Sequence, residues 1–277
     1  MTQFDLEFTI SLAKEAGSLL QGFFQSISLA TRRKADRSLV TQADLDADEL
    51  IAGALHDRFP EDVLISEELA PTVPPGIDPK SSAIWVIDPL DGTTNFSMGL
   101  LHWGVSLARL EMGIPKLAVV YFPMLNQLYT AEHGTGAKLN HQPINIDPEA
   151  HRNMSFFSCC SRTYHRYEVD IPYKTRIFGC ASYTYCAVAS SVAVLGFEAT
   201  PKIWDIAAAW LVVEEAGGAI GVLEGPPPFP IKGERDYTAQ VYPTIAAATM
   251  EQMDWGKARI KRKVGRDHNK DGNSPVL

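Results

Sequence analysis

The chain has 277 residues, of which 45% are hydrophobic, and its formal net charge is −8 at pH 7. This length and apolar content suffice for a sizeable core in one or two domains. The acidic balance argues against general nucleic-acid binding, which requires a basic face. It leaves an anionic phosphate substrate open, because bound cations can reverse the local field.

No apolar run is long enough for a transmembrane helix, so we expect no membrane partner. The N-terminus carries Asp5 and Glu7 early and lacks the basic and apolar regions of a signal peptide. The cysteines do not form C-x-x-C or a paired zinc spacing, and we expect reduced thiols in a cytoplasmic protein. They are Cys159, Cys160, Cys180 and Cys186.

The apolar spacing predicts helices and strands mixed along the chain. An amphipathic helix is expected over residues 4–25, a polar loop or hairpin over 31–38, and a second helix over about 44–59, with Asp44 at its N-cap. The later elements, in order, are a strand at 63–66, a Pro-rich loop at 71–79, strands at 103–110, 116–122, 127–132 and 154–159, helices at 181–195 and 205–215, and a strand at 244–248.

We expect one domain over residues 1–255, with approximate subdomains at 1–145 and 146–255. The segment 256–277 is basic and polar, which is typical of a solvated helix end and a frayed terminus. A weak contact with an anionic partner is the alternative for this tail.

The most informative segment, residues 83–96, reads Ala-Ile-Trp-Val-Ile-Asp-Pro-Leu-Asp-Gly-Thr-Thr-Asn-Phe. Its apolar run predicts a buried strand that ends in a turn, so that Asp88 and Asp91 can point into one pocket. Mg²⁺ prefers such carboxylates together with substrate phosphate, and the N–H groups of a Gly-Thr turn suit a phosphate. Taken alone, a D-x-x-D pair is more often a solvated turn.

The whole segment closely resembles the main signature of the inositol monophosphatase family, which comprises Mg²⁺-dependent, lithium-sensitive phosphomonoesterases. Residues 39–44 resemble the family's upstream acidic motif, residues 65–68 its paired-glutamate motif, and residues 204–218 its C-terminal signature. The four segments follow the family's order, and the similarity covers roughly residues 5–250. The resemblance implies an α/β (α+β) fold, a layered αβαβα sandwich of the inositol monophosphatase and fructose-1,6-bisphosphatase type.

The resemblance also implies a site with two or three Mg²⁺ ions. The implied metal ligands are Glu67, Asp88, the main-chain carbonyl of Leu90, Asp91 and Asp205. Glu67 and Asp88 would share one ion, and Asp88, Asp91 and Asp205 would hold a second. Read from the residues alone, Asp205 is equally explained as a cap at a helix start.

Three catalytic residues are implied in the same way. Thr93 would orient the attacking water, Asp44 would accept the proton, and Glu68 would act behind Glu67. A helix N-cap explains Asp44 as well, and an exposed loop charge explains Glu68.

The resemblance assigns substrate binding to five residues. The N–H groups of Gly92 and Thr93 would bind phosphate, and Cys180, Ala181 and Glu198 would contact the alcohol part. The chain departs from the family pattern here, because Cys180 replaces a usual serine and Val194 stands where an Asp is common. Glu198 could also be a plain surface acid.

The expected reaction is Mg²⁺-dependent hydrolysis of inositol monophosphate or a related sugar phosphate by metal-activated water. Histidinol phosphate, fructose 1,6-bisphosphate and 3′-phosphoadenosine 5′-phosphate are alternative substrates. A catalytically idle, metal-stabilised binding protein is the alternative from another class. The family resemblance further implies inhibition by Li⁺, competition by Ca²⁺ and a homodimer.

Overall fold

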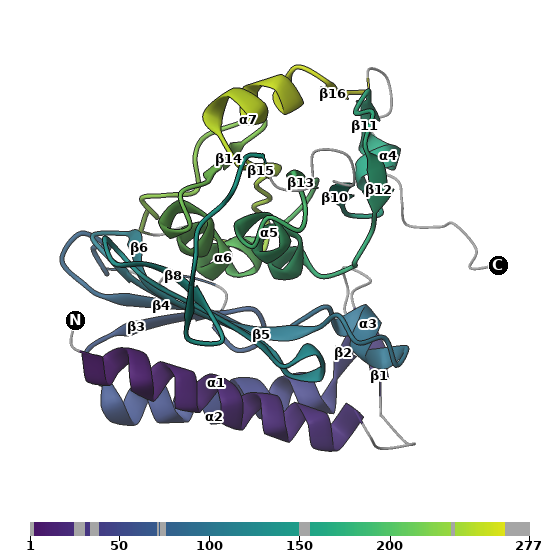
Figure 1. Ribbon diagram of the computed structural model, residues 1–277. Helices are drawn as coiled ribbons and strands as arrows, with labels where there is room; N and C mark the ends of the chain where they lie inside the picture. The colour runs from purple at the N-terminus through teal and green to yellow at the C-terminus, as the bar shows by residue number, and fades with distance from the viewer. Residues whose placement is uncertain are drawn as a thin grey trace.

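The computed structural model describes residues 3–24, 31–33, 39–70, 72, 76–149, 156–233 and 236–263. Five layers follow one another from the bottom to the top of Figure 1: a helix pair, a large sheet, a second helix pair, a smaller sheet and a last helix. The predicted αβαβα sandwich is therefore confirmed. Within the described ranges, no helix combines the length and the apolar character needed to cross a membrane.

The outer helix pair covers one face of a seven-stranded sheet. Leu20, Ile51 and Trp85 are among the side chains buried between them. The helices are α1 (Gln3–Phe24) and α2 (Gln42–Arg58). The strands, in spatial order, are β3 (Val63–Ser66), β4 (Ile84–Asp91), β5 (Gly104–Glu111), β6 (Ile114–Phe122), β7 (Gln127–Glu132), β8 (Gly136–Leu139) and β9 (Gln142–Ile144). Only the β3–β4 pairing in this sheet is parallel.

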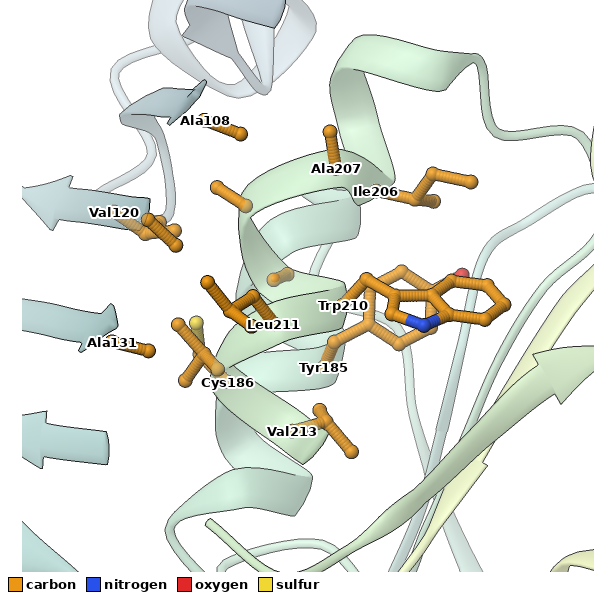
Figure 2. Close-up of a cluster of buried hydrophobic side chains, with 14 of the residues drawn as sticks. Ala108, Val120, Ala131, Tyr185, Cys186, Ile206, Ala207, Trp210, Leu211 and Val213 are labelled. Carbon is orange, nitrogen blue, oxygen red and sulfur yellow. The ribbon is translucent and has the colours of Figure 1, made fainter. Parts of the chain in front are cut away.

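Helices α5 (Ala181–Ala189) and α6 (Ile203–Glu215) lie between the two sheets. Helix α6 is apolar on all sides, as expected of a helix buried by its neighbours. In Figure 2, Leu211 points toward the strands that carry Val120 and Ala131, and Trp210 points away from them. Side chains of α6 therefore pack on both sides of the helix. This packing fixes the position of the N-terminus of α6.

The smaller sheet has five strands and is covered by α7 (Met250–Lys257). Its spatial order is β12 (Lys174–Arg176), β10 (Phe156–Cys159), β13 (Leu195–Glu198), β15 (Thr244–Ala247) and β14 (Ala219–Val222). The first sheet draws on residues 63–144 and the second on residues 156–247. The subdomain boundary expected near residue 145 stays a prediction.

Short elements complete the described structure. They are a hairpin of β1 (Thr31–Arg33) and β2 (Leu39–Thr41), helix α3 (Thr93–Ser97), the 3₁₀ turn η1 (Pro123–Leu125), helix α4 (Thr163–Arg166), and β11 (Tyr167–Val169) paired with β16 (Ile260–Arg262). Of the predicted elements, residues 34–38 of the hairpin, 71 and 73–75 of the Pro-rich loop, and 154–155 of a strand lie outside the described residues.

The helix predicted over residues 181–195 is wrong in its second half. Helix α5 ends at Ala189, where Val192 and Ala193 both donate their N–H groups to the carbonyl of Ala187. Ser191 takes a left-handed conformation with φ of 59°, which breaks the helical path. The chain then enters strand β13, whose short apolar run cannot be distinguished from a helix by spacing alone.

The start of the predicted tail is folded rather than frayed. Helix α7 runs to Lys257, and Ile260–Arg262 pairs antiparallel with Tyr167–Val169. The described fold therefore continues past the boundary predicted at residue 255. Residues 264–277 lie outside the described part of the chain.

Candidate active site

Strand β4 presents Asp88 and Asp91 on the same face of the sheet through a β-bulge. Asp88 pairs with Ser106 and Asp91 with Gly104, so three steps along β4 match two steps along β5. In a regular strand, residues three apart point to opposite faces, and one extra residue restores a common face. Pro89, which has no N–H to place in a ladder, lies within this irregular stretch. The expected turn after Asp88 is thus a bulge, and the strand continues to Asp91.

Three carboxylates converge at the end of β4. Ligand oxygens of Glu67, Asp88 and Asp205 all lie within 4.8 Å of one another. Glu67 directly follows β3, and because β3 and β4 are parallel neighbours, their carboxyl ends reach the same edge. Asp205 is brought to this edge by the buried start of α6. The structure thus brings three of the expected metal ligands together.

This cluster carries a strong electrostatic penalty that a cation would relieve. Burial, followed by the charges of Glu67 and Asp91, raises the pKa of Asp88 well above its usual value. Burial and the charge of Asp91 likewise raise the pKa of Asp205. The Oδ1 atom of Asp88 accepts the Leu90 N–H (3.1 Å), while its buried Oδ2 has no hydrogen-bond partner. A buried carboxylate oxygen without a donor, in an all-oxygen set, fits Mg²⁺.

Asp91 lies beside this cluster but is held by the N-terminus of α5. Its Oδ2 accepts hydrogen bonds from Ser182 N–H (2.6 Å), Ser182 Oγ (2.6 Å) and Cys180 Sγ (3.1 Å). Its Oδ1 accepts only the Ala181 N–H (3.1 Å) among the described contacts. Asp91 is not part of the three-residue group described above. Its Oδ1 is the oxygen with more remaining capacity for a metal.

The turn after β4 places a hydroxyl next to a buried carboxylate. Gly92 has φ of 93°, and a Cβ there would come within 2.8 Å of the His102 carbonyl oxygen. Only glycine therefore fits this turn without strain. Thr93 Oγ1 then lies 3.5 Å from Asp44 Oδ2 and 3.1 Å from the Leu90 carbonyl oxygen. The predicted pair of Thr93 and Asp44 is thus brought together.

Asp44 and Asp205 occupy equivalent positions in their helices. Helix α2 begins at Gln42 and α6 at Ile203, so each aspartate is the third helical residue rather than the N-cap. Asp205 Oδ2 accepts the Lys202 N–H (2.7 Å) and so closes a capping box. Its capping and site roles are therefore compatible, because the other carboxylate oxygen is not used in that bond.

Glu198 is the last residue of β13 in the smaller sheet, and its side chain is buried. Its Oε1 accepts a hydrogen bond from Thr184 Oγ1 (2.7 Å). Burial raises the pKa of Glu198 to about 8, an effect opposed by the hydrogen bond from Thr184. The charge of Asp91 acts on the same carboxyl, and the charge of Arg162 opposes it. Glu198 is therefore a buried acid near the carboxylate cluster rather than a surface acid.

Comparison with known proteins identifies the relationship. The model of the inositol monophosphatase family matches residues 2–254. The chain belongs to the inositol monophosphatase family. A histidinol-phosphatase of Chlorobaculum parvum is 34% identical over 224 residues, covering 77% of this chain and 84% of that protein. A fructose-1,6-bisphosphatase/inositol-1-monophosphatase of Thermotoga maritima is 31% identical over 231 residues, covering 79% and 85%.

Solved structures show the same fold. The crystal structure of an IMPase/NADP phosphatase complexed with Mg²⁺ and phosphate has a TM-score of 0.75 and 24% identity, covering 91% of this chain and 93% of that one. Several curated relatives that are 30–33% identical are named Nus factor SuhB. The predicted class of this member of the inositol monophosphatase family, a phosphoric monoester hydrolase, is confirmed.

Several residues of this family member's site were missed from its sequence. Ser182 donates twice to Asp91, and Thr184 holds Glu198. Asp48, one helical turn after Asp44 on α2, is fully buried and bonds to the segment that carries Glu67. The spacing of Asp44 and Asp48 could have signalled that both face the sheet. Cys180 and Ala181, assigned to the substrate side, contact Asp91 in the structure.

Proposed function

We propose that the chain hydrolyses a small phosphate monoester, inositol monophosphate or a related sugar phosphate, in a Mg²⁺-dependent reaction. The observation that carries this proposal is the oxygen-only cluster of Glu67, Asp88 and Asp205 beside the Thr93–Asp44 pair. A structural role for three converging carboxylates is disfavoured, because their mutual repulsion lowers stability when no cation is bound.

The residues divide the cation sites between them. Glu67 and Asp88 would hold one Mg²⁺, and Asp88, the Oδ1 of Asp91 and Asp205 a second, with the Leu90 carbonyl as a main-chain ligand. The proposal is two or three Mg²⁺ ions in this site. When bound, Mg²⁺ lowers the pKa of a coordinated water and neutralises charge on the phosphoryl oxygens.

The remaining residues orient the nucleophile and the phosphate. Asp44 Oδ2 would accept the proton of the Thr93 hydroxyl, which leaves a Thr93 lone pair to accept a hydrogen bond from the attacking water. The main-chain N–H groups of Gly92 and Thr93 would bind the phosphate. The water would attack phosphorus in line with the leaving alcohol. Glu68 lies half-buried next to Glu67 and would act behind it. Charge stabilisation supplies most of the barrier reduction in such reactions.

A phosphate-release panel tests the reaction and ranks the substrates. The purified protein is assayed with Mg²⁺ and inositol 1-phosphate, histidinol phosphate, fructose 1,6-bisphosphate and 3′-phosphoadenosine 5′-phosphate. We expect turnover of at least one monoester, complete and reversible loss of activity in EDTA, inhibition by Li⁺ and competition by Ca²⁺. The names of the two relatives above support histidinol phosphate and fructose 1,6-bisphosphate as alternatives. Full turnover in exhaustively chelated buffer would contradict the proposal.

A catalytically idle, metal-stabilised binding protein is the alternative from another class. The panel separates the two, because an idle protein would bind Mg²⁺ and gain thermal stability without releasing phosphate. The presence of Asp44 and Thr93 in contact distance supports catalysis.

Glu198 should contact the alcohol part of the substrate in a pH-dependent manner. Its pKa is raised to about 8, so the acid is mostly protonated at pH 7 and mostly ionised at pH 9. Glu198→Gln resembles the protonated form. We therefore expect a KM ratio between variant and wild type that widens from pH 7 to pH 9, with an unchanged Mg²⁺ requirement. An identical substrate ranking and KM at both pH values would return Glu198 to a structural role.

Two further expectations remain proposals. A homodimer is expected from the family resemblance, and light scattering of the purified protein checks it. A cytoplasmic location is in keeping with the four cysteines, which are all free thiols in the structure. Cell fractionation with a tagged chain checks the location.

A further inference from the structure

A buried carboxylate outside the predicted set holds the turn that carries Glu67. Asp48 lies on α2 with 0% of its surface exposed. Its Oδ2 accepts hydrogen bonds from Ser66 Oγ (2.7 Å) and from the Leu69 N–H (3.0 Å). Asp48 therefore connects to the chain on both sides of Glu67, since Ser66 precedes it and Leu69 follows Glu68.

The same turn is also closed by hydrogen bonds among its own residues. Ser66 Oγ accepts the N–H groups of Leu69 (3.1 Å) and Ala70 (3.1 Å). The Ser66 N–H in turn donates to the Ala70 carbonyl oxygen (2.8 Å). Because Ser66 Oγ has a single proton and gives it to Asp48, the orientation of its lone pairs toward Leu69 and Ala70 depends on that carboxylate.

The carboxylate is an expensive means of holding a turn. A buried charge needs compensation, and Oδ1 of Asp48 is buried without a hydrogen-bond partner. Two neutral acceptors could satisfy the same donors at a lower desolvation cost. A buried carboxylate of this kind is expected where its hydrogen bonds set the geometry of a functional residue. The residue enclosed by this turn is Glu67.

We propose that Asp48 is a positioning residue for the cation site, which fixes the turn at residues 66–70 so that Glu67 faces Asp88 and Asp205. Glu67 belongs to the group whose oxygens lie within 4.8 Å of one another. A turn that lost its anchor would let Glu67 leave this group, while Asp88 and Asp205 stay in place on β4 and α6. This inference rests on the proposed function only in that the bound ion is taken to be Mg²⁺.

The test is direct titration of Mg²⁺ into the metal-free protein by calorimetry, which needs no substrate and no turnover. Asp48→Ala removes both bonds and should raise the Kd for Mg²⁺ by about 10- to 100-fold. Asp48→Asn keeps an oxygen acceptor for Ser66 and Leu69 and should stay much closer to wild type. In the phosphate-release assay, Asp48→Ala should raise the half-saturating Mg²⁺ concentration far more than it lowers kcat at saturating Mg²⁺.

The matched control is Asp46→Ala, on the same helix. The Asp46 side chain accepts a hydrogen bond from Gln42 Nε2 (2.8 Å) on the helix surface, so its removal should leave Mg²⁺ affinity unchanged. If Asp48→Ala does not fold, Ser66→Ala removes one of the two hydrogen bonds between Asp48 and the turn and should weaken Mg²⁺ binding by itself. The loss of affinity in the double variant should be smaller than the sum of the two single losses, since both substitutions remove the bond between Ser66 and Asp48.

Three results would overturn the proposal. The first is a folded Asp48→Ala or Ser66→Ala protein that binds Mg²⁺ within twofold of wild type. The second is an equal loss in Asp48→Asn and Asp48→Ala, which would assign the effect to charge rather than to the bonds. The third is an equal loss in Asp46→Ala. Mg²⁺ binding without any phosphate release would contradict the proposed reaction and leave this inference standing.

Discussion

Asp88→Asn should reduce phosphate release by about 100- to 1,000-fold or more, since each charge-stabilising contact in such sites is worth that much. Asp88 is central to the three converging carboxylates and is the residue shared between the two proposed ions. Its Oδ2 has no hydrogen-bond partner, so replacing that oxygen by an amide removes a ligand without breaking a bond. The measurement is kcat/KM at saturating Mg²⁺, with Asp46→Asn as the surface control.

The same variant should be more stable than wild type when no metal is present. Burial and neighbouring charges raise the pKa of Asp88 in the folded state above the unfolded value of about 3.9. The metal-free native state thus binds this proton more tightly, and its free energy of unfolding falls as pH rises between the two pKa values. The advantage of Asp88→Asn should therefore grow as pH rises above the unfolded value and vanish toward pH 4. Thermal melts in EDTA across that range check it, and a destabilised variant at pH 7 would contradict it.

Asp205→Asn should lower activity by more than the roughly 10–100-fold that loss of a supporting contact causes. Asparagine retains an oxygen that can accept the Lys202 N–H, so the capping box at the start of α6 survives. The charge is lost, and the Mg²⁺ requirement should move to higher concentration while the fold stays intact. Magnesium titrations of phosphate release measure this shift.

Asp205→Ala is the informative companion variant. It removes the cap as well as the charge, and should cost a further 0.5–2 kcal/mol or so of stability. If Asp205 served only as a cap, Asp205→Asn would retain near-normal turnover and metal affinity. That outcome would refute the assignment and weaken the two-metal proposal.

The sequence was sufficient to predict an element where the composition and spacing of its residues fit one kind of secondary structure. The strand at Val63–Ser66 and the strands that became β5, β6 and β7 were predicted because their apolar residues alternate or run between clear turns. Glu67, Asp88 and Asp205 were predicted from the family resemblance, and the structure brings them together. Residue spacing alone left a cap as an equal explanation for Asp205.

The sequence was insufficient where tertiary contacts decided the outcome. The apolar stretch after Ala189 fits a helix or a strand, and pairing with β10 and β15 selects the strand. Strand β16 forms from a basic, polar segment because β11 offers a partner. The role of Ser182 depends on α5 meeting Asp91, two segments far apart in the chain. Such contacts leave no periodic signal.

The bulge in β4 has a consequence for how the spacing of Asp88 and Asp91 is understood. A regular strand would place two acids on one face with a single residue between them, about 6.6–6.8 Å apart along the chain. The bulge leaves Pro89 and Leu90 without a register partner in β5, and the Leu90 carbonyl oxygen accepts a hydrogen bond from Thr93 Oγ1 (3.1 Å). In this buried strand, the D-x-x-D spacing that breaks the two-residue period thus goes with a main-chain oxygen outside the β5 ladder as well as with two carboxylates.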